Sequence, residues 1–136
     1  MLNIMKPTHP SPGGLSPVSL AFVGDCVFEL MVRQRLVSGG GMPAGKLHAA
    51  AVERVRASAQ ALAFDAVLAL ATQAESEILR RGRNVSLSRI PKSCTPEQYH
   101  KATAIESLLG FLYLDGQLDR LGEIFEVIEG VASQKK

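Results

Sequence analysis

Apolar residues recur along this chain at helical spacing, and no stretch alternates apolar and polar positions as a β-strand would. In residues 16–37 the apolar side chains point in almost every direction around a helix, which predicts a helix buried at the centre of the molecule. Ser16 and Pro17 suit its N-cap and first helical position, and the glycines after Ser38 end it. The pattern therefore predicts an all-α fold.

The next two helices are predicted from their start and stop signals. Pro43 restarts a helix that carries "KLHAAAVERVRASAQALAF", and a bend is expected before Asp65. Thr72 opens the third helix, because Glu75 three residues later completes a capping-box pattern. Gly82 is expected to end this helix as a C′ glycine.

Two further helices complete the predicted fold. "TPEQ" at residues 95–98 predicts an N-cap followed by proline. The helix that it starts is expected to run through "KATAIESLLGFLYLD" to Asp115, with Gly116 ending it. The last helix, "LDRLGEIFEVIEG", is expected to stop near Gly130.

A single domain is expected from the 136 residues of the chain. We predict a flexible N-terminal tail at 1–15, a helical domain at 16–131 and a flexible C-terminal tail at 132–136. No signal peptide or membrane-spanning run is visible, and the two cysteines lack metal-ligand spacing, so a cytoplasmic protein without membrane contact is expected. The formal net charge is only +2, so nucleic-acid binding would require a local basic patch.

Two acidic residues lie in apolar helices, where an unpaired carboxylate is costly to bury. Asp25 is in the middle of "SLAFVGDCVFELMV", and Glu106 is surrounded by small residues in the fourth helix. A shared Mg²⁺ or Mn²⁺ would explain why both charges are tolerated. The alternatives are that such a buried aspartate caps a nearby helix or forms an ion pair, for which Arg33, Arg35 and Arg54 could supply the guanidinium.

These two helices carry motifs that resemble those of the ribonuclease III family. "LAFVGDCVFEL" resembles the family's signature helix, roughly E-x-x-E-F-L-G-D-A-V-L-E. "KATAIESLLGFLYLDG" resembles its second acidic motif, roughly K-A-D-x-x-E-A-L-I-G-A-I-Y-L-D. With "ILRRGRN" and "VRASAQA", the nearest resemblance is to the Mini-III branch, whose members have a lone catalytic domain and no double-stranded-RNA-binding domain.

The resemblance implies that Asp25 and Glu106 are catalytic and bind the metal. The family's two signature glutamates correspond here to Val18 and Ala21, and its second-motif aspartate corresponds to Thr103. The Mini-III branch has such a reduced set of acids, which leaves the number of bound ions open.

The implied activity is hydrolysis of phosphodiester bonds in double-stranded RNA, with Mg²⁺ as cofactor and 5′-phosphate and 3′-hydroxyl products. The implied active unit is a two-fold homodimer, with the signature helix near the interface. Phe22 and Phe28 are candidates for interface or core packing. By the same resemblance, the substrate is a large-subunit (23S) ribosomal RNA precursor, and a ribosomal protein is an assisting partner.

Basic residues gather between the third and fourth helices and are candidates to bind phosphates and 2′-hydroxyls of RNA. The predicted RNA-binding residues are Arg80, Arg81, Arg83, Asn84, Arg89, Lys92 and Lys101. For Arg80 and Arg81 the alternative is that they only favour the C-terminal end of a helix dipole.

Two other functions stay open at this point. A helical-bundle nucleotide pyrophosphatase needs several acids on one helix, but Glu123, Glu126 and Glu129 have the spacing of the water-facing side of an amphipathic helix. A catalytically inactive RNA-binding or dimerisation module of the same fold would account for the missing signature glutamates. The presence of Asp25 and Glu106 favours an enzyme.

Overall fold

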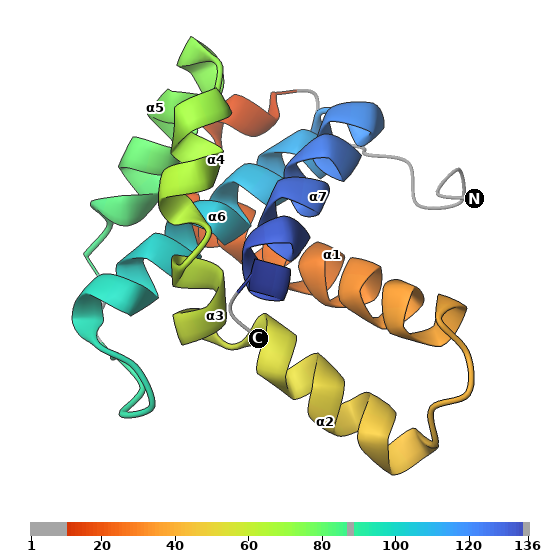
Figure 1. The fold of residues 1–136 in the computed structure, drawn as a ribbon. Coiled ribbons are helices and arrows are strands. Elements are labelled where there is room, and N and C mark those ends of the chain that lie inside the picture. The colour runs from red at the N-terminus through yellow and green to blue at the C-terminus, as the bar shows by residue number, and fades with distance from the viewer. Residues whose placement is uncertain (1–10, 87–88, 135–136) are drawn as a thin grey trace.

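The computed structural model describes residues 11–86 and 89–134, and these ranges contain helices and no β-strand (Figure 1). A 3-10 turn, Pro12–Gly14, precedes the α-helices. The α-helices are α1 (Pro17–Ser38), α2 (Ala44–Val55), α3 (Ala57–Ala61), α4 (Phe64–Leu70), α5 (Gln73–Arg83), α6 (Pro96–Leu114) and α7 (Leu118–Gln134). The predicted all-α fold is confirmed.

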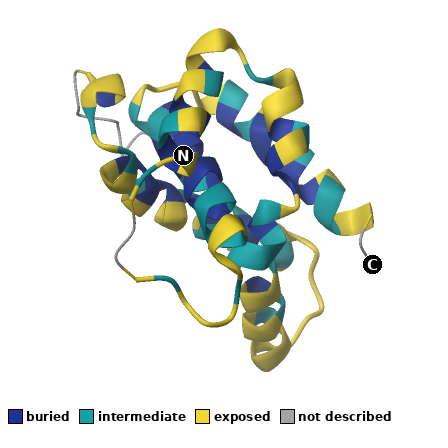
Figure 2. Cartoon of the chain, turned by 90° about the vertical axis from the view of Figure 1, so that its left-hand side faces the viewer, coloured by how far each residue is buried: buried dark blue, intermediate teal, exposed yellow. Residues whose placement is uncertain are grey.

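Helices α1 and α6 cross at the centre of the molecule, and α3, α5 and α7 pack around α6 (Figure 1). Helix α6 is buried on almost every side, which explains its apolar composition. Helix α1 buries one face against α6 and exposes apolar residues on the other, contrary to the prediction of a helix buried all round. In Figure 2 buried positions lie where helices face one another, and exposed positions lie outside.

The contact between α1 and α6 depends on two glycines. A Cβ atom on Gly24 would lie 1.8 Å from the backbone oxygen of Glu106, and one on Gly110 would lie 1.9 Å from the backbone oxygen of Leu20. Neither separation is sterically possible, so the two backbones touch only because both positions lack a side chain.

The second predicted helix is instead three short ones, α2, α3 and α4. The break between α2 and α3 is at Arg56, whose backbone is extended with φ −71° and ψ 154°. A second break, at residues 62–63, precedes α4, where a bend was expected. The break at Arg56 turns the chain back across α6. Residues 46–63 contain neither proline nor glycine, so the sequence pattern did not predict this break.

Helix boundaries follow the predicted caps in most places. Thr72 caps α5 in a capping box with Glu75, and Gly116 follows α6 with φ +77°, both as predicted. Gly82 does not end α5, because the helix continues to Arg83. A Cβ on Gly82 would lie 2.8 Å from the Cα of Ala104, so this glycine is needed for the packing of α5 on α6.

Ion pairs attach α7 to the rest of the bundle. Arg120 bonds the buried Glu75 of α5 through two contacts of 2.8 and 2.9 Å, and Arg54 of α2 bonds Glu129. Glu129 is buried, so its assignment to a water-facing series was wrong. It turns inward because Arg54 neutralises its charge there.

Only parts of the two predicted tails lie in the described residues. Residues 1–10 and 135–136 are outside them, whereas Pro12 is buried and α7 continues past Gly130 to Gln134. Arg81 donates hydrogen bonds to the backbone oxygens of Gly13 and Leu15, which holds this segment against α5. None of the helices in the described ranges has the length and apolarity needed to cross a bilayer.

Substituting Gly110→Ala is expected to lower the free energy of unfolding by roughly 3 kcal/mol or more, because its new Cβ would force α1 and α6 apart. Gly130→Ala is the matched control, since a Cβ there meets nothing within 4 Å and alanine favours a helix by up to about 1 kcal/mol. Urea unfolding followed by circular dichroism measures both. Equal stability of Gly110→Ala and the wild type would contradict the close helix contact.

Candidate active site

The contact between α1 and α6 brings Asp25 and Glu106 together. Gly24, the residue before Asp25, touches the backbone of Glu106 itself, so the two side chains leave the helices next to each other. Asp25 is exposed and Glu106 is half-buried. The prediction that Asp25 is buried was therefore wrong: the helix face that carries it opens on a cleft instead of the core.

The cleft has a volume of about 430 Å³ and is bounded by α1, α6, the α2–α3 break and the loop before α6. Asp25 and Glu106 lie in it together with Arg56, Gln60 and Tyr99. Its remaining lining is mostly small or apolar. The cleft is thus an open site with two carboxylates and a single cationic side chain among the described residues that line it.

Glu106 has an unusual protonation equilibrium. Burial raises the pKa of its carboxyl to about 8, a hydrogen bond from Gln60 opposes this rise, and the charge and hydrogen bonding of Asp25 add to it. The two carboxyl groups therefore face each other closely enough to interact directly. Such a pair is costly to ionise completely unless a cation lies between the two groups.

The donor set fits a hard divalent cation. Carboxylate oxygens are the ligands that Mg²⁺ prefers, and Mg²⁺ is often held by one or two carboxylates with water and substrate phosphate in its other positions. A cation held by Asp25 and Glu106 would remove the repulsion that helps to raise the pKa of Glu106. The described residues contain no group of three or more His, Cys, Asp or Glu side chains placed to hold a metal. Water and substrate would therefore complete the coordination.

Comparison with known proteins decides the family. A family model described as the ribonuclease III domain matches residues 18–117. A Mini-ribonuclease 3 of Symbiobacterium thermophilum is 39% identical over 116 residues, which are 85% of this chain and 89% of that protein. The chain belongs to the ribonuclease III family, in its Mini-ribonuclease 3 branch.

Other relatives agree with this placement. A Mini-ribonuclease 3 of a Thermoanaerobacter species is 41% identical over 113 residues, 83% of this chain and 80% of that protein. The crystal structure of a protein from Fusobacterium nucleatum matches with a TM-score of 0.81 at 25% identity, over 90% of this chain and 98% of that one. The chain is therefore an endoribonuclease, a hydrolase of a family that generally depends on divalent metal and acts on double-stranded RNA.

The positions at which the motif resemblance predicts further acids in this family also lie at the cleft. Val18, Ala21 and Thr103 all line it. The Thr103 hydroxyl donates a hydrogen bond to the backbone oxygen of Tyr99 at 2.9 Å. Among the described residues that line the cleft, Asp25 and Glu106 are the two that carry carboxylates.

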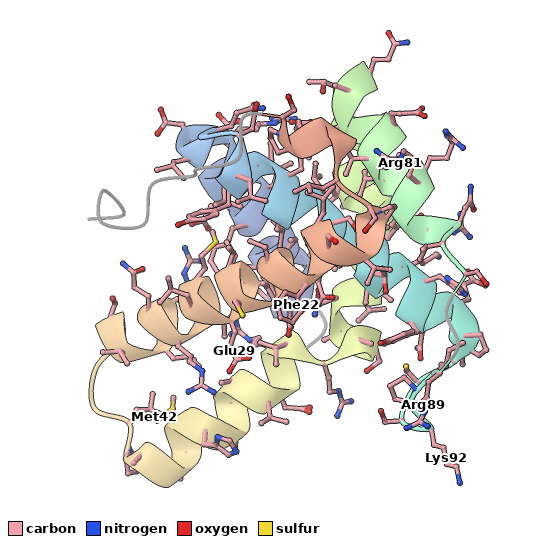
Figure 3. All side chains as sticks on the ribbon, turned by 180° about the vertical axis from the view of Figure 1, so that it is seen from behind. Phe22, Glu29, Met42, Arg81, Arg89 and Lys92 are labelled. Carbon is pink, nitrogen blue, oxygen red and sulfur yellow. The ribbon has the colours of Figure 1, made fainter. Side chains whose placement is uncertain are left out.

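None of the predicted RNA-binding residues is among the described residues that line the cleft. Arg80 pairs with Glu77, and Arg81 holds the backbone near Gly13. Lys101 pairs with Glu97 at 3.1 Å, and Arg83 stacks on the ring of Phe64, 5.3 Å from its centre. The remaining three are exposed, and Asn84 lies at the end of α5. Arg89 and Lys92 lie on the loop before α6 (Figure 3).

Sequence reasoning missed Arg56 and Gln60. Both lie at the break between α2 and α3, which the pattern predicted as continuous helix. Arg56 is exposed at the cleft and pairs with Glu53 at 3.0 Å, whereas Gln60 is buried and bonds Glu106. The resemblance of "VRASAQA" to the Mini-III branch was the available signal, because it contains both residues.

In a metal chelator, the free energy of unfolding is expected to fall as the pH rises from about 4.5 to about 8. In that window Glu106 keeps its proton when folded and loses it when unfolded, so each pH unit costs up to about 1.4 kcal/mol. Below the window both states are protonated and the stability is fully present. Urea unfolding of the wild type and of Glu106→Gln in EDTA measures the slope.

The Glu106→Gln variant is expected to lose most of this slope, since its amide does not titrate. Adding Mg²⁺ at pH 8 is expected to stabilise the wild type and to leave the variant nearly unchanged. A slope that is the same in both proteins would show that Glu106 does not titrate in this range.

Proposed function

We propose that this chain is a divalent-metal-dependent endoribonuclease that hydrolyses double-stranded RNA and leaves 5′-phosphate and 3′-hydroxyl ends. The observation that carries the proposal is the pair of facing carboxylates, Asp25 and Glu106, in an open cleft of a ribonuclease III fold. These two residues would hold Mg²⁺, or Mn²⁺ in its place. A bound ion supplies Lewis-acid stabilisation of the reacting phosphate and lowers the pKa of a bound water.

The cleft supports a specific arrangement for the RNA backbone. Arg56 brings a guanidinium to the cleft beside the two carboxylates, where it would contact a phosphate near the scissile bond. Pro91 and Ser93 line the cleft, so the loop that carries Lys92 and Arg89 reaches its rim. The exposed cations of this loop would contact phosphates further along the duplex.

The other predicted RNA contacts rank lower, because they already have protein partners. Arg80 and Lys101 are paired with glutamates, and Arg81 bonds the backbone of the N-terminal segment. Arg83 lies over Phe64 with its nearest carboxylate 3.9 Å away, and is the easiest of the four to release. Asn84 remains a polar contact at the end of α5.

A second copy of this chain is the proposed partner of the exposed face of α1. A groove of about 400 Å³ between α1 and α7 is lined mainly by apolar side chains, including Cys26, Leu30 and Leu118. Phe22 projects from α1 (Figure 3), is 78% exposed, and borders both this groove and the acidic cleft. Phe28, the other interface candidate, is instead in the core against Phe125.

A two-fold dimer would cover this groove and supply one site for each strand of a duplex, whose backbone is itself nearly two-fold symmetric. Sedimentation of the purified chain tests the dimer. A monomer at concentrations that cleave RNA would exclude it.

The biological substrate that we propose is a 23S ribosomal RNA precursor with base-paired ends, processed in the cytoplasm with the help of a ribosomal protein. The kinship with Mini-ribonuclease 3 proteins supports this choice. A catalytically inactive RNA-binding module is the competing function, since Val18, Ala21 and Thr103 replace acids of the wider family.

Asp25→Asn is expected to reduce cleavage of end-labelled double-stranded RNA by more than about 100-fold. Loss of a residue that only supports a metal ligand costs up to about 100-fold, and Asp25 is proposed to be a ligand itself. EDTA should have the same effect on the wild type. Asp119→Asn is the control, because Asp119 is an exposed acid in the first turn of α7, outside the cleft. The inactive module would be favoured if folded wild-type protein left RNA uncut in Mg²⁺ but still bound RNA in EDTA.

Arg56→Gln is expected to weaken RNA binding and to reduce the slope of log affinity against log salt concentration by about one, as loss of one phosphate contact does. Arg33→Gln is the matched control: Arg33 is also exposed and paired with a glutamate of its own helix, but lies outside the cleft. Filter binding at several salt concentrations in EDTA measures both. Identical slopes for Arg56→Gln and the wild type would remove Arg56 from the RNA path.

A further inference from the structure

Gln60 is a polar side chain in a fully buried position. It lies on the short helix α3, is 1% exposed, and borders the acidic cleft. Burial of an amide is unfavourable unless its hydrogen-bonding groups find partners. An apolar side chain of the same size would fill this position without that cost, so packing alone does not account for glutamine here.

The amide nitrogen of Gln60 has two acceptors. It donates one hydrogen bond to the backbone oxygen of Val55 at 2.7 Å and another to Oε2 of Glu106 at 3.1 Å. Both hydrogens of the amide are therefore used. Rotating the amide by half a turn would place Oε1 of Gln60 against the backbone oxygen of Val55, which can only accept, so this partner determines the orientation of the amide.

The first of these acceptors exists because of the break at Arg56. Val55 is the last residue of α2, and the extended backbone at Arg56 removes the helical partner that the Val55 oxygen would otherwise have. Gln60 thus connects the end of α2 directly to the Glu106 carboxylate. The same break brings Arg56 to the cleft, so one local change of backbone positions both side chains.

The remaining atom of the amide, Oε1, is buried without a hydrogen-bond partner. An unsatisfied buried oxygen is destabilising, and native structures contain few of them. Its presence beside the carboxylates means that the position is adapted to Glu106 at the expense of stability. An oxygen that can only accept also suits a site that would contain cation-bound water, whose hydrogens need acceptors.

We propose that Gln60 is a positioning residue of the metal site, which holds the Glu106 carboxylate towards Asp25 and so strengthens the binding of a divalent cation. This inference rests on the proposed function, because it takes Asp25 and Glu106 as the metal ligands. Gln60 acts through Glu106 and contacts neither substrate nor metal directly. Partners of this type commonly contribute 10- to 100-fold to metal affinity or activity.

Gln60→Met tests the proposal, since methionine is unbranched, similar in length and unable to donate a hydrogen bond. Its affinity for Mn²⁺, measured by electron paramagnetic resonance on the full chain without RNA, is expected to fall about 10- to 100-fold. The Mg²⁺ concentration that gives half-maximal cleavage should rise by a similar factor, and cleavage should recover as Mg²⁺ is raised. Gln73→Met is the control, because Gln73 is an exposed residue of α5 away from the cleft.

Unfolding in EDTA separates positioning from a structural role. Gln60→Met is expected to remain folded in EDTA with a moderately lower unfolding temperature, because the Val55 oxygen loses its partner while the unpartnered Oε1 is removed. If Gln60→Met does not fold, Gln60→Asn replaces it: this side chain is one methylene shorter and still polar, but does not span Val55 and Glu106. The same loss of Mn²⁺ affinity is expected.

Asp25→Asn keeps the two proposals distinguishable. The role of Gln60 would be overturned if a folded Gln60 variant kept its Mn²⁺ affinity and Mg²⁺ dependence within a factor of two of the wild type. If Asp25→Asn lost both in the same experiments, the proposed nuclease function would still stand. Wild-type protein that neither binds Mn²⁺ nor cleaves RNA would overturn the proposed function, and the role of Gln60 with it.

Discussion

The crossing of α1 and α6 is the contact on which the rest of this structure depends. Gly24 and Gly110 each meet the backbone of the opposite helix, so the helices approach closely enough for peptide groups to touch. This contact determines where the neighbouring residues lie. Asp25 and Glu106 become adjacent because each is attached to a helix at the point of crossing, and no flexible loop has to hold them in place.

Placing two carboxylates at this crossing makes the site unfavourable on its own. Burial and the nearness of Asp25 raise the pKa of Glu106 to about 8, which would keep one carboxyl protonated at neutral pH. The hydrogen bond from the amide of Gln60 favours the ionised form of Glu106, and a bound divalent cation would favour it further. The close helix contact keeps the two carboxyl groups next to each other, so their repulsion is not relieved by moving apart.

Small residues and ion pairs also determine how α5 and α7 pack on the rest of the bundle. Gly82 lets α5 approach α6, and ion pairs through Arg120 and Arg54 fasten α7. Among the described residues, none covers the exposed apolar face of α1, and Phe22 lies both on this face and at the cleft. The bundle is therefore well packed on one side of α1 and open to association on the other.

Local signals and motifs in the sequence determined the helical class, the capped starts at Ser16, Thr72 and Thr95, and the pairing of Asp25 with Glu106. These features depend on residues close in the chain, or on two motifs whose spacing is characteristic of a family. Packing between distant residues left no such local signal. Only the tertiary structure decided that Asp25 is exposed, that Glu129 is buried against Arg54, and that Gly82 serves helix packing instead of ending a helix.

The break at Arg56 belongs to this second group. A helix-favouring segment turns there although residues 46–63 contain neither proline nor glycine, and the turn lets Gln60 donate hydrogen bonds to both Val55 and Glu106. The side chains that complete the site, Arg56 and Gln60, are placed by contacts between α2, α3 and α6 that exist only once the chain has folded.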